Sequence, residues 1–380
     1  MNQPINQPVS QAIAKTDPAS AYQQGLQEGL LPDPAQERAV DALQELHQKL
    51  SEFHKHRGSW KGRVMERLGL ETGKPGKGIY LWGGVGRGKT WLMDSFYRTL
   101  PGERKMRMHF HRFMQMVHAR LREAGGQSNP LELVADSIAS RVDIICFDEF
   151  FVSDIGDAMI LGNLLEALFA RKIVLVATSN LPPQGLYENG LQRQNFLPAI
   201  ALLKQYTQVI NVDGGVDYRL RSLDKTAVYL SPIGPDSEEA MKVLFSDLTM
   251  GMDAQESRML EINERYFLAK KWTESVVWFD FSVLCGGPRG AADYIELARG
   301  YHTVFISGLP ALDRARDDEA RRFLTLVDEF YDHNVKLVIS AEVPIESLYS
   351  DGILAFAMER TTSRLLEMQT REYLARPHTP

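Results

Sequence analysis

Cysteine is scarce in this chain, which has only two cysteines, Cys146 and Cys285, among its 380 residues. Two thiols cannot supply the several bridges that hold small secreted domains together. Cys146 also stands inside an apolar run, 144–147, where a thiol packs as a small hydrophobic side chain. We therefore expect no disulfide framework and a protein that resides in a reducing cytosol.

Long hydrophobic runs and an excess of positive charge are also missing. The apolar runs are short, and none approaches the ~20 residues that span a bilayer. The first twenty residues lack the basic start and the apolar stretch of a secretory signal. Lys and Arg number 43 against 49 Asp and Glu, so no overall positive field attracts nucleic acid. These absences predict a cytoplasmic protein with no membrane span and no nucleic acid among its partners.

The length of the chain suits about two domains of ~100–200 residues each. Residues 1–20 are rich in Gln, Pro, Ser and Ala without an aromatic anchor, so we expect them to be disordered. The spacing of Val40, Leu43, Leu46 and Leu50 predicts a packing helix over 33–55. The rest of the predicted organisation is an N-terminal helical segment at 21–75, a core at 76–222 and a C-terminal region at 223–380.

Within the core, short apolar runs alternate with longer amphipathic ones, which is typical of a parallel sheet covered by helices. The predicted strands are 79–82, 107–111, 143–147, 173–178 and 208–212. The predicted helices between them are 89–100, 112–124, 155–170 and 193–204. In such a doubly wound α/β fold, ligands bind beyond the carboxyl ends of the strands.

The second half shows the same alternation, with predicted strands at 227–230, 276–281, 303–307 and 335–340 and a helix at 314–332. We therefore expect a C-terminal α/β region. Residues 328–349 also echo 166–187, since both read as a helix end, a buried strand, proline and a Leu-Tyr pair. Two explanations fit this echo equally well. One is a degenerate internal duplication, and the other is convergence, since helix-strand units often share such patterns. The second half lacks acids where Asp148 and Glu149 stand, so nucleotide chemistry is assigned to the first half.

The strongest motif is GGVGRGKT, which fits the G-x-x-x-x-G-K-[ST] pattern of a P-loop. It follows an apolar strand and opens an amphipathic helix, where backbone N–H groups can wrap a phosphate. In this pattern Lys89 meets the β- and γ-phosphates of ATP, and the Thr90 hydroxyl ligates Mg²⁺. The predicted nucleotide-binding residues are Gly83, Gly84, Val85, Gly86, Arg87, Gly88, Lys89 and Thr90.

Two adjacent acids, Asp148 and Glu149, stand at the end of a buried strand. Another predicted strand and helix lie between this strand and the P-loop helix. An acid at this place faces the P-loop, so Asp148 is predicted to hold Mg²⁺ through water. Glu149 is predicted to orient or deprotonate the attacking water. The second acid favours hydrolysis over simple binding, which makes the chain an expected ATPase.

The following strand ends in Thr178, Ser179 and Asn180, which places polar groups beside the phosphate site. Asn180 is predicted to hold the attacking water, although an Asn also suits the turn before two prolines. Phe150 and Phe151 could contact a polymer threaded through a ring. Buried packing is the more frequent role of such a pair, and we favour it.

Long stretches of the chain resemble the ZapE family of bacterial cell-division ATPases, which has mitochondrial AFG-type relatives. The resemblance is carried by GIYLWGGVGRGKTWLMDSFY at 78–97, MHFHRFM at 108–114, CFDEFFVSDIGDAM at 146–159, ATSNLPPQGLYENGLQRQNFLPAI at 177–200, VDYRLR at 216–221, EARRFLTLVDEFYDHNVKLVISAEVP at 319–344 and SRLLEMQTREYL at 363–374. These segments are long and specific, and together they cover nearly the whole chain.

The resemblance implies an AAA+ type of P-loop fold, ATP hydrolysis in a homo-oligomeric ring and, for bacterial members, association with division-ring proteins through the tubulin-like FtsZ. It identifies 83–90 as the Walker A element and Asp148 with Glu149 as the Walker B element. It identifies Asn180 as the first sensor. It also implies that Arg193 is an arginine finger that reaches into a neighbouring subunit's site.

The resemblance to AAA+ proteins departs from their usual pattern at 223–380, which reads as mixed α/β rather than as a small helical lid. The second sensor arginine of such a lid has four candidates here, and Gln36 is a guess for an adenine contact. The four candidates are Arg219, Arg221, Arg360 and Arg364. A nucleic-acid-associated loader and a non-hydrolysing nucleotide switch remain as alternatives. The acidic net charge disfavours the loader, and Glu149 disfavours the switch.

Overall fold

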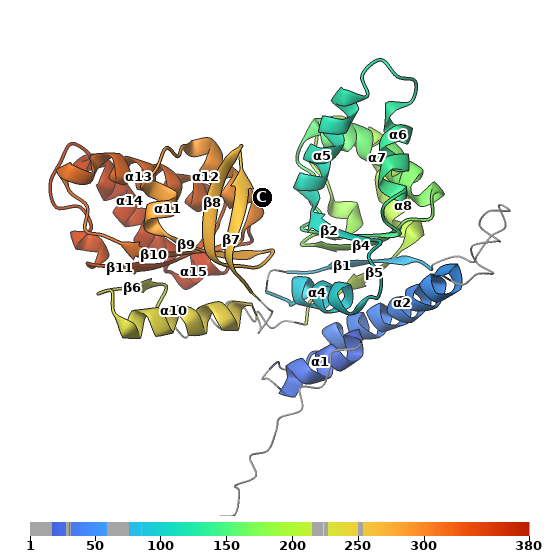
Figure 1. Ribbon diagram of the computed structural model, residues 1–380, viewed down its shortest axis with the longest axis horizontal. Helices are drawn as coiled ribbons and strands as arrows, with labels where there is room; N and C mark the ends of the chain where they lie inside the picture. The colour runs from blue at the N-terminus through green and yellow to red at the C-terminus, as the bar shows by residue number, and fades with distance from the viewer. Residues whose placement is uncertain are drawn as a thin grey trace, which may run out of the picture.

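A computed structural model of the chain describes 17–27, 30, 32–58, 76–84, 86–214, 223, 227–249 and 254–379. Figure 1 shows two lobes side by side, each with a central sheet between layers of helices. The first lobe comprises the described residues of 17–214, and the second lobe comprises those of 223–379. The P-loop and both predicted acids belong to the first lobe.

The first lobe is built on a parallel sheet of five strands in the order β2-β3-β4-β1-β5. The strands are β1 (Gly78–Trp82), β2 (Lys105–His109), β3 (Ile144–Asp148), β4 (Val174–Ser179) and β5 (Thr207–Asn211). The predicted doubly wound P-loop fold is thereby confirmed, and β2 lies two residues earlier than predicted. This order places the P-loop, which follows β1, beside the end of β4, with β3 as the next strand.

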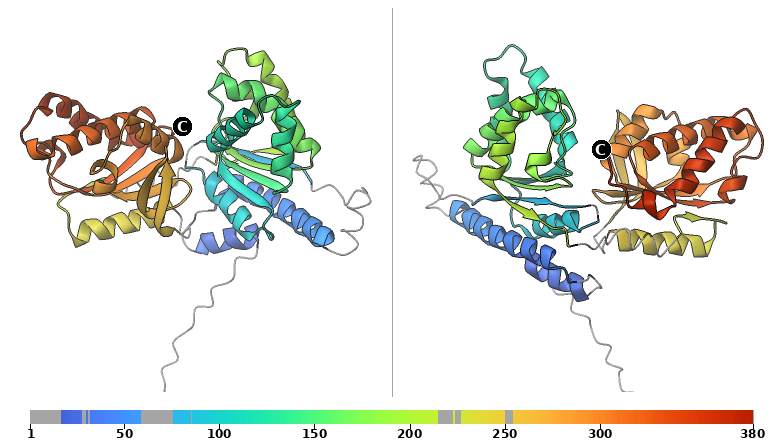
Figure 2. Two further views of the ribbon diagram at one scale, coloured as in Figure 1. Left: turned by 45° about the horizontal axis from the view of Figure 1, so that its top comes forward. Right: turned by 180° about the vertical axis from the view of Figure 1, so that it is seen from behind.

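Helices cover both faces of this sheet (Figures 1 and 2). One face packs against α1 (Pro18–Gln27), α2 (Pro34–Gly58) and α4 (Lys89–Thr99), and the other against α5 (Phe110–Glu123), α6 (Pro130–Ala139), α7 (Ile155–Ala170) and α8 (Leu197–Tyr206). Side chains of β1 alternate between the two cores, with Ile79 and Leu81 on the α4 face and Tyr80 on the α7 face. β1, β3 and β4 are buried on both faces and read as apolar runs, which explains why these three strands were predictable.

The expected disorder of residues 1–20 is wrong at its C-terminal boundary, because α1 begins at Pro18. Tyr22 is buried in this helix, and its ring packs on Trp91 with centroids 6.2 Å apart. The backbone N–H of Ala19 donates to Gln44 Oε1 at 3.1 Å. The aromatic anchor that the first twenty residues lack thus stands two positions beyond them. The rest of that segment, 1–16, lies outside the described residues.

The second lobe has a six-stranded sheet in the order β6-β11-β10-β9-β8-β7. Its strands are β6 (Tyr229–Leu230), β7 (Gln255–Ile262), β8 (Arg265–Trp272), β9 (Val276–Asp280), β10 (Thr303–Leu309) and β11 (Lys336–Ala341). Its helices are α10 (Pro235–Leu248), α11 (Phe281–Cys285), α12 (Ala291–Gly300), α13 (Asp317–Asp332), α14 (Ala355–Met368) and α15 (Arg371–Leu374). The predicted α/β character is confirmed. The antiparallel hairpin of β7 and β8 was not predicted.

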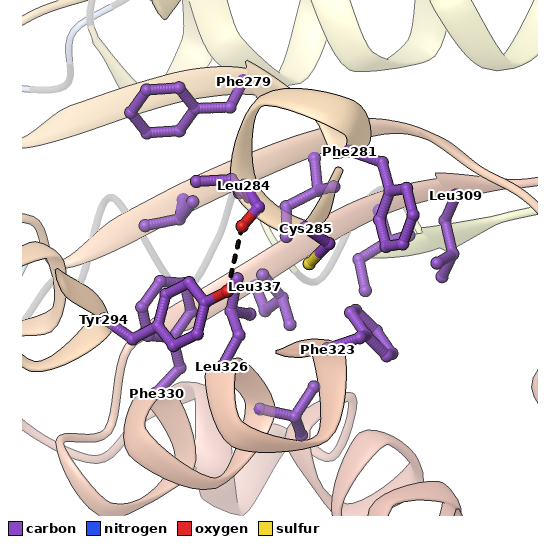
Figure 3. Close-up of a cluster of buried hydrophobic side chains, with 14 of the residues drawn as sticks. Phe279, Phe281, Leu284, Cys285, Tyr294, Leu309, Phe323, Leu326, Phe330 and Leu337 are labelled. Atoms are coloured by element: carbon purple, nitrogen blue, oxygen red, sulfur yellow. Dashed lines mark hydrogen bonds between the residues drawn. The ribbon is translucent and has the colours of Figure 1, made fainter. Parts of the chain in front are cut away.

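Aromatic and aliphatic side chains fill the core of the second lobe between its sheet and α11 to α14 (Figure 3). Tyr294 is fully buried there, and its hydroxyl donates to the Leu284 carbonyl at 2.9 Å. Burial raises the pKa of the Cys285 thiol, and it raises that of the Cys146 thiol in the first lobe to about 12. Both thiols are therefore protonated core groups. Among the described helices, none has the length and apolarity needed to cross a bilayer.

The two lobes share a strand order. In the first lobe β1, β4, β3 and β2 are neighbours in that sequence, and in the second lobe β6, β11, β10 and β9 follow the same sequence, all parallel. The echoing segments 166–187 and 328–349 fall on corresponding helix-strand units. The loop between β6 and α10, which corresponds to the P-loop, is Ser-Pro-Ile-Gly and has no lysine. This correspondence favours duplication over convergence, and it leaves phosphate chemistry to the first lobe.

Gly78, at the start of β1, provides a test of how tightly β1 and β4 pack. A Cβ atom at Gly78 would lie 1.9 Å from the Leu175 carbonyl oxygen, so the backbone must shift to accept Gly78→Ala. We expect this variant to lose about 1–3 kcal/mol in the free energy of unfolding, measured by urea denaturation. Gly287→Ala is the matched control, because nothing lies within 4 Å of its Cβ position. Equal unfolding midpoints for the two variants would contradict the close approach.

Candidate functional site

The P-loop connects β1 to α4 through backbone conformations that require glycine. Gly83, Gly86 and Gly88 have φ angles of 153°, 71° and 76°, in the region that side chains disfavour. Gly88 directly precedes α4 and caps it in the left-handed conformation. The loop therefore ends at a helix N-terminus, which favours an anion. Val85 lies outside the described residues.

Gln36 of α2 fastens this loop from the side. Its Nε2 donates to the Arg87 carbonyl at 3.0 Å, and it lies 2.8 Å from the position of a Cβ on Gly88. Arg87 itself pairs with Asp213, which follows β5, at 2.8 Å. The adenine contact of Gln36 stays a prediction. Its contact with the P-loop backbone is a different role, which the sequence did not predict.

Lys89 is folded back into the P-loop. Its Nζ donates to the carbonyls of Gly83 at 2.8 Å and Gly84 at 2.6 Å and to Asn180 Oδ1 at 3.0 Å. Lys89 and Asn180 were predicted from separate motifs, and the structure brings them into contact across β1 and β4. An ammonium group held by neutral oxygens can exchange these partners for phosphate oxygens, which carry charge.

Asp148 ends β3 with a nearly fully buried side chain. Arg107 of β2 donates to its Oδ2 through NH2 at 2.5 Å and through Nε at 3.0 Å. The same guanidinium pairs with Asp94 of α4, the helix that the P-loop opens. Arg107 therefore joins the P-loop helix to the strand that carries the predicted metal ligand. Neither Arg107 nor Asp94 was predicted, although an arginine at the start of a predicted strand was a signal that could have identified Arg107.

The donor set suits a magnesium ion. Mg²⁺ prefers hard oxygen ligands, and the Thr90 hydroxyl and the Asp148 carboxylate are of that kind. Only Asp148 Oδ2 is engaged by Arg107, while Oδ1 receives one long hydrogen bond of 3.4 Å from Thr178 Oγ1. The buried network has two carboxylates against one guanidinium, which leaves room for added positive charge. These residues fit Mg²⁺ together with the phosphates of ATP.

Glu149 follows Asp148 with a φ angle of 50°, and its N–H lies 3.2 Å from Thr178 Oγ1. Its carboxylate lies against two histidines. His378 Nδ1 is 3.3 Å from Oε1, and His109 Nδ1 is 3.8 Å from Oε2. His378 belongs to the C-terminal tail, 229 positions away, so sequence spacing gave no signal for this contact.

A third histidine, His111 at the start of α5, also faces the second lobe. Its Nε2 lies 3.5 Å from Glu296 of α12. Burial lowers the pKa of His111, and the hydrogen bond from His111 lowers the pKa of the Glu296 carboxyl. The region around the end of β2 is therefore an interface between the lobes that directly adjoins Glu149.

Arg193 lies in a short 3₁₀ helix, η2 (Arg193–Asn195), after β4. Its NH2 donates to the Gln184 carbonyl at 2.6 Å, and no contact among the described residues joins it to Lys89 or Asp148. Of the candidates for a second sensor, Arg360 and Arg364 both pair with Asp328 in the second lobe. The other two, Arg219 and Arg221, lie outside the described residues.

Of the expected pair Phe150 and Phe151, Phe150 is fully buried, and its ring lies 4.3 Å from that of Phe110. Phe151 is partly exposed beside it. The packing role favoured from the sequence is thus observed for the first phenylalanine and does not extend to the second.

Comparison with known proteins shows the family to which the chain belongs. The family model described as AFG1-like ATPase matches residues 16–377. The chain is 49% identical over 369 residues to the cell division protein ZapE of Escherichia coli K12, which covers 95% of this chain and 98% of that protein. It is 38% identical over 344 residues to lactation elevated protein 1 homolog B of Danio rerio, covering 79% of this chain and 68% of that one. A chain with this fold, this P-loop and these matches belongs to the AFG1-like ATPase family.

Proposed function

We propose that this ATPase hydrolyses ATP with Mg²⁺ at the P-loop end of the first sheet and uses the energy to remodel a protein assembly. In this mechanism Lys89 binds the β- and γ-phosphates, and Thr90 and Asp148 hold the metal ion. Asn180 positions the attacking water, and Glu149 accepts its proton. The observation that carries the proposal is the contact of Lys89 Nζ with Asn180 and the two P-loop carbonyls, since it unites separate motifs at one site.

The assembly that we propose as the substrate is the bacterial division ring, in particular polymers of FtsZ. The support is the 49% identity to a protein named for cell division over nearly the whole of both chains. The acidic formal charge of −6 also agrees with a protein partner rather than nucleic acid.

We further propose that the ATPase works as a homo-oligomeric ring in which Arg193 completes the site of a neighbouring subunit. Arg193 is on η2, and among the described residues its guanidinium donates to one backbone carbonyl, that of Gln184. A guanidinium tethered by a single neutral acceptor can reorient toward a phosphate at low cost.

The role of Glu149 is tested by Glu149→Gln. The substitution keeps the size of the side chain and removes its basicity, so ATP binding should persist while turnover falls by about 10²–10⁴. Calorimetry measures binding, and phosphate release measures turnover. Lys89→Ala is the contrasting variant, since it should lose tight ATP binding together with hydrolysis. A Glu149→Gln protein with nearly full turnover would remove Glu149 from the role of base.

The role of Arg193 is tested by mixing two inactive variants. Arg193→Ala should bind ATP normally and hydrolyse it ~10³–10⁵ more slowly. When it is mixed with Lys89→Ala, some interfaces pair an intact P-loop with an intact arginine, and part of the activity should return. Gln194→Ala, a change at an exposed neighbour in η2, is the control and should keep wild-type turnover. If mixed oligomers form without any recovery, Arg193 does not act across an interface.

The proposed substrate is tested by light scattering of FtsZ polymers. Wild-type protein with ATP should change the scattering, whereas protein without nucleotide and the Glu149→Gln variant with ATP should not produce the same change. This pattern is expected because remodelling needs completed hydrolysis. Identical traces under all three conditions would exclude a direct action on FtsZ.

A further inference from the structure

The carboxylate of Glu149 is held by side chains that are anchored on the second lobe. His378 Nε2 donates to the Ala298 carbonyl at 2.6 Å, and its Nδ1 lies 3.3 Å from Glu149 Oε1. His109 Nε2 donates to the Glu274 carbonyl at 2.7 Å, and its Nδ1 lies 3.8 Å from Glu149 Oε2. Both carbonyls belong to the second lobe, so the predicted base of the first lobe is set between two rings fastened to the other lobe.

These contacts have little freedom. The side chains of His378 and His109 are 2% and 3% exposed. A carbonyl oxygen can only accept a hydrogen bond, so each Nε2 carries a proton and each ring is oriented by it. A carboxylate oxygen also only accepts, so the hydrogen bond of His378 with Glu149 Oε1 needs a second proton on Nδ1 and pairs an imidazolium with the carboxylate. The Nδ1 atoms are thereby turned toward Glu149.

The order of the strands shows on which side of the site the carboxylate lies. In the order β2-β3-β4-β1, β2 and the P-loop strand β1 are on opposite sides of β3. His109 ends β2, so the carboxylate of Glu149 makes this contact on the β2 side of β3. The P-loop strand β1 lies two strands from β3 on the other side, roughly 10 Å away. A general base must come within about 2.6–3.2 Å of its water, which lies beside the γ-phosphate. The contacts of Glu149 with His109 and His378 therefore lie on the side of β3 that is opposite to the P-loop strand.

The tail that carries His378 is fastened to the second lobe. Lys336 Nζ of β11 donates to the carbonyls of Tyr373 at 3.1 Å and Arg376 at 2.9 Å. The N–H of Thr379 donates to the His333 carbonyl at 3.0 Å. The C-terminal end accordingly lies between the lobes (Figure 2). A displacement of the second lobe would withdraw His378 from Glu149, whereas His109 is part of the first sheet and would remain.

We propose that His378 is a positioning residue through which the second lobe restrains Glu149 in a resting orientation and so couples ATP hydrolysis to the position of that lobe. The inference rests on the proposed role of Glu149 as the base. When the tail is withdrawn, the carboxylate loses its contact with His378, which favours its turning toward the water at the γ-phosphate. The side chain of His378 does not contact the P-loop among the described residues, so nucleotide binding is unaffected by it.

Two isosteric substitutions separate the restraint from simple packing. The amide nitrogen of Asn occupies the place of a histidine Nδ1, and that of Gln occupies the place of Nε2. His378→Asn therefore keeps a donor toward Glu149, and His378→Gln keeps only the anchor on Ala298. We expect His378→Gln to raise kcat about three- to tenfold with an unchanged KM for ATP, because one hydrogen bond that restrains the base is lost. His378→Asn should stay near the wild-type kcat.

Glu372→Ala, which removes an exposed side chain of α15, is the control and should leave kcat unchanged. Thermal melting and calorimetry with ATP verify the fold and binding of each protein. A chain that ends at Pro377 is the second variant, and it should show the same rise as His378→Gln if substitutions at 378 unfold the tail.

An unchanged or lowered kcat in both His378→Gln and the shortened chain would overturn the restraint, as would equal effects of Asn and Gln. Glu149→Gln in the same assay distinguishes a wrong assignment of the base from a wrong assignment of the restraint. If Glu149→Gln keeps its turnover, the assignment of the base has failed. If it loses turnover while the His378 variants match the wild type, only the restraint has failed.

Discussion

The buried ion network of Arg107, Asp94 and Asp148 is the constraint on which the rest of the site depends. The three side chains are 7%, 5% and 2% exposed. Removing such charges from water costs several kcal/mol per ion, so the arrangement is stable only when each charge meets its partner. Asp94 lies in the helix that begins at the P-loop, and Asp148, the predicted metal ligand, ends β3. The guanidinium of Arg107 therefore joins the predicted phosphate-binding and metal-binding parts of the site.

Each reactive group of the site has a protein partner in this arrangement. Lys89 contacts backbone carbonyls and Asn180, Asp148 contacts Arg107, and Glu149 contacts His378. Nucleotide and metal binding would replace these partners. The net free energy of binding is therefore reduced by the cost of breaking the existing contacts. His378 differs from the other partners because it comes from the second lobe.

The second lobe is a P-loop-like sheet without P-loop chemistry. Its strands β6, β11, β10 and β9 follow the order of β1, β4, β3 and β2, and a hairpin, β7 with β8, extends the edge. The loop after β6 has no lysine to meet a phosphate, and β10 ends without acids. A sheet of this kind can keep its core while its site is lost, since the core needs only apolar side chains on both faces. The lobe then serves the first lobe by placing carbonyls and a tail beside Glu149.

The amino-acid sequence by itself determined the fold of the first lobe and the position of its predicted site. Apolar strands buried on both faces, a glycine-rich loop and two acids after a strand are local patterns, and each was read within a few residues of its position. The parts that the sequence did not reveal depend on contacts between distant segments. Tyr22 orders α1 through Trp91, Arg107 meets two acids from other elements, and His378 reaches Glu149 across 229 positions. Local sequence patterns cannot predict such pairs, because the two residues meet only when the sheets and lobes pack together.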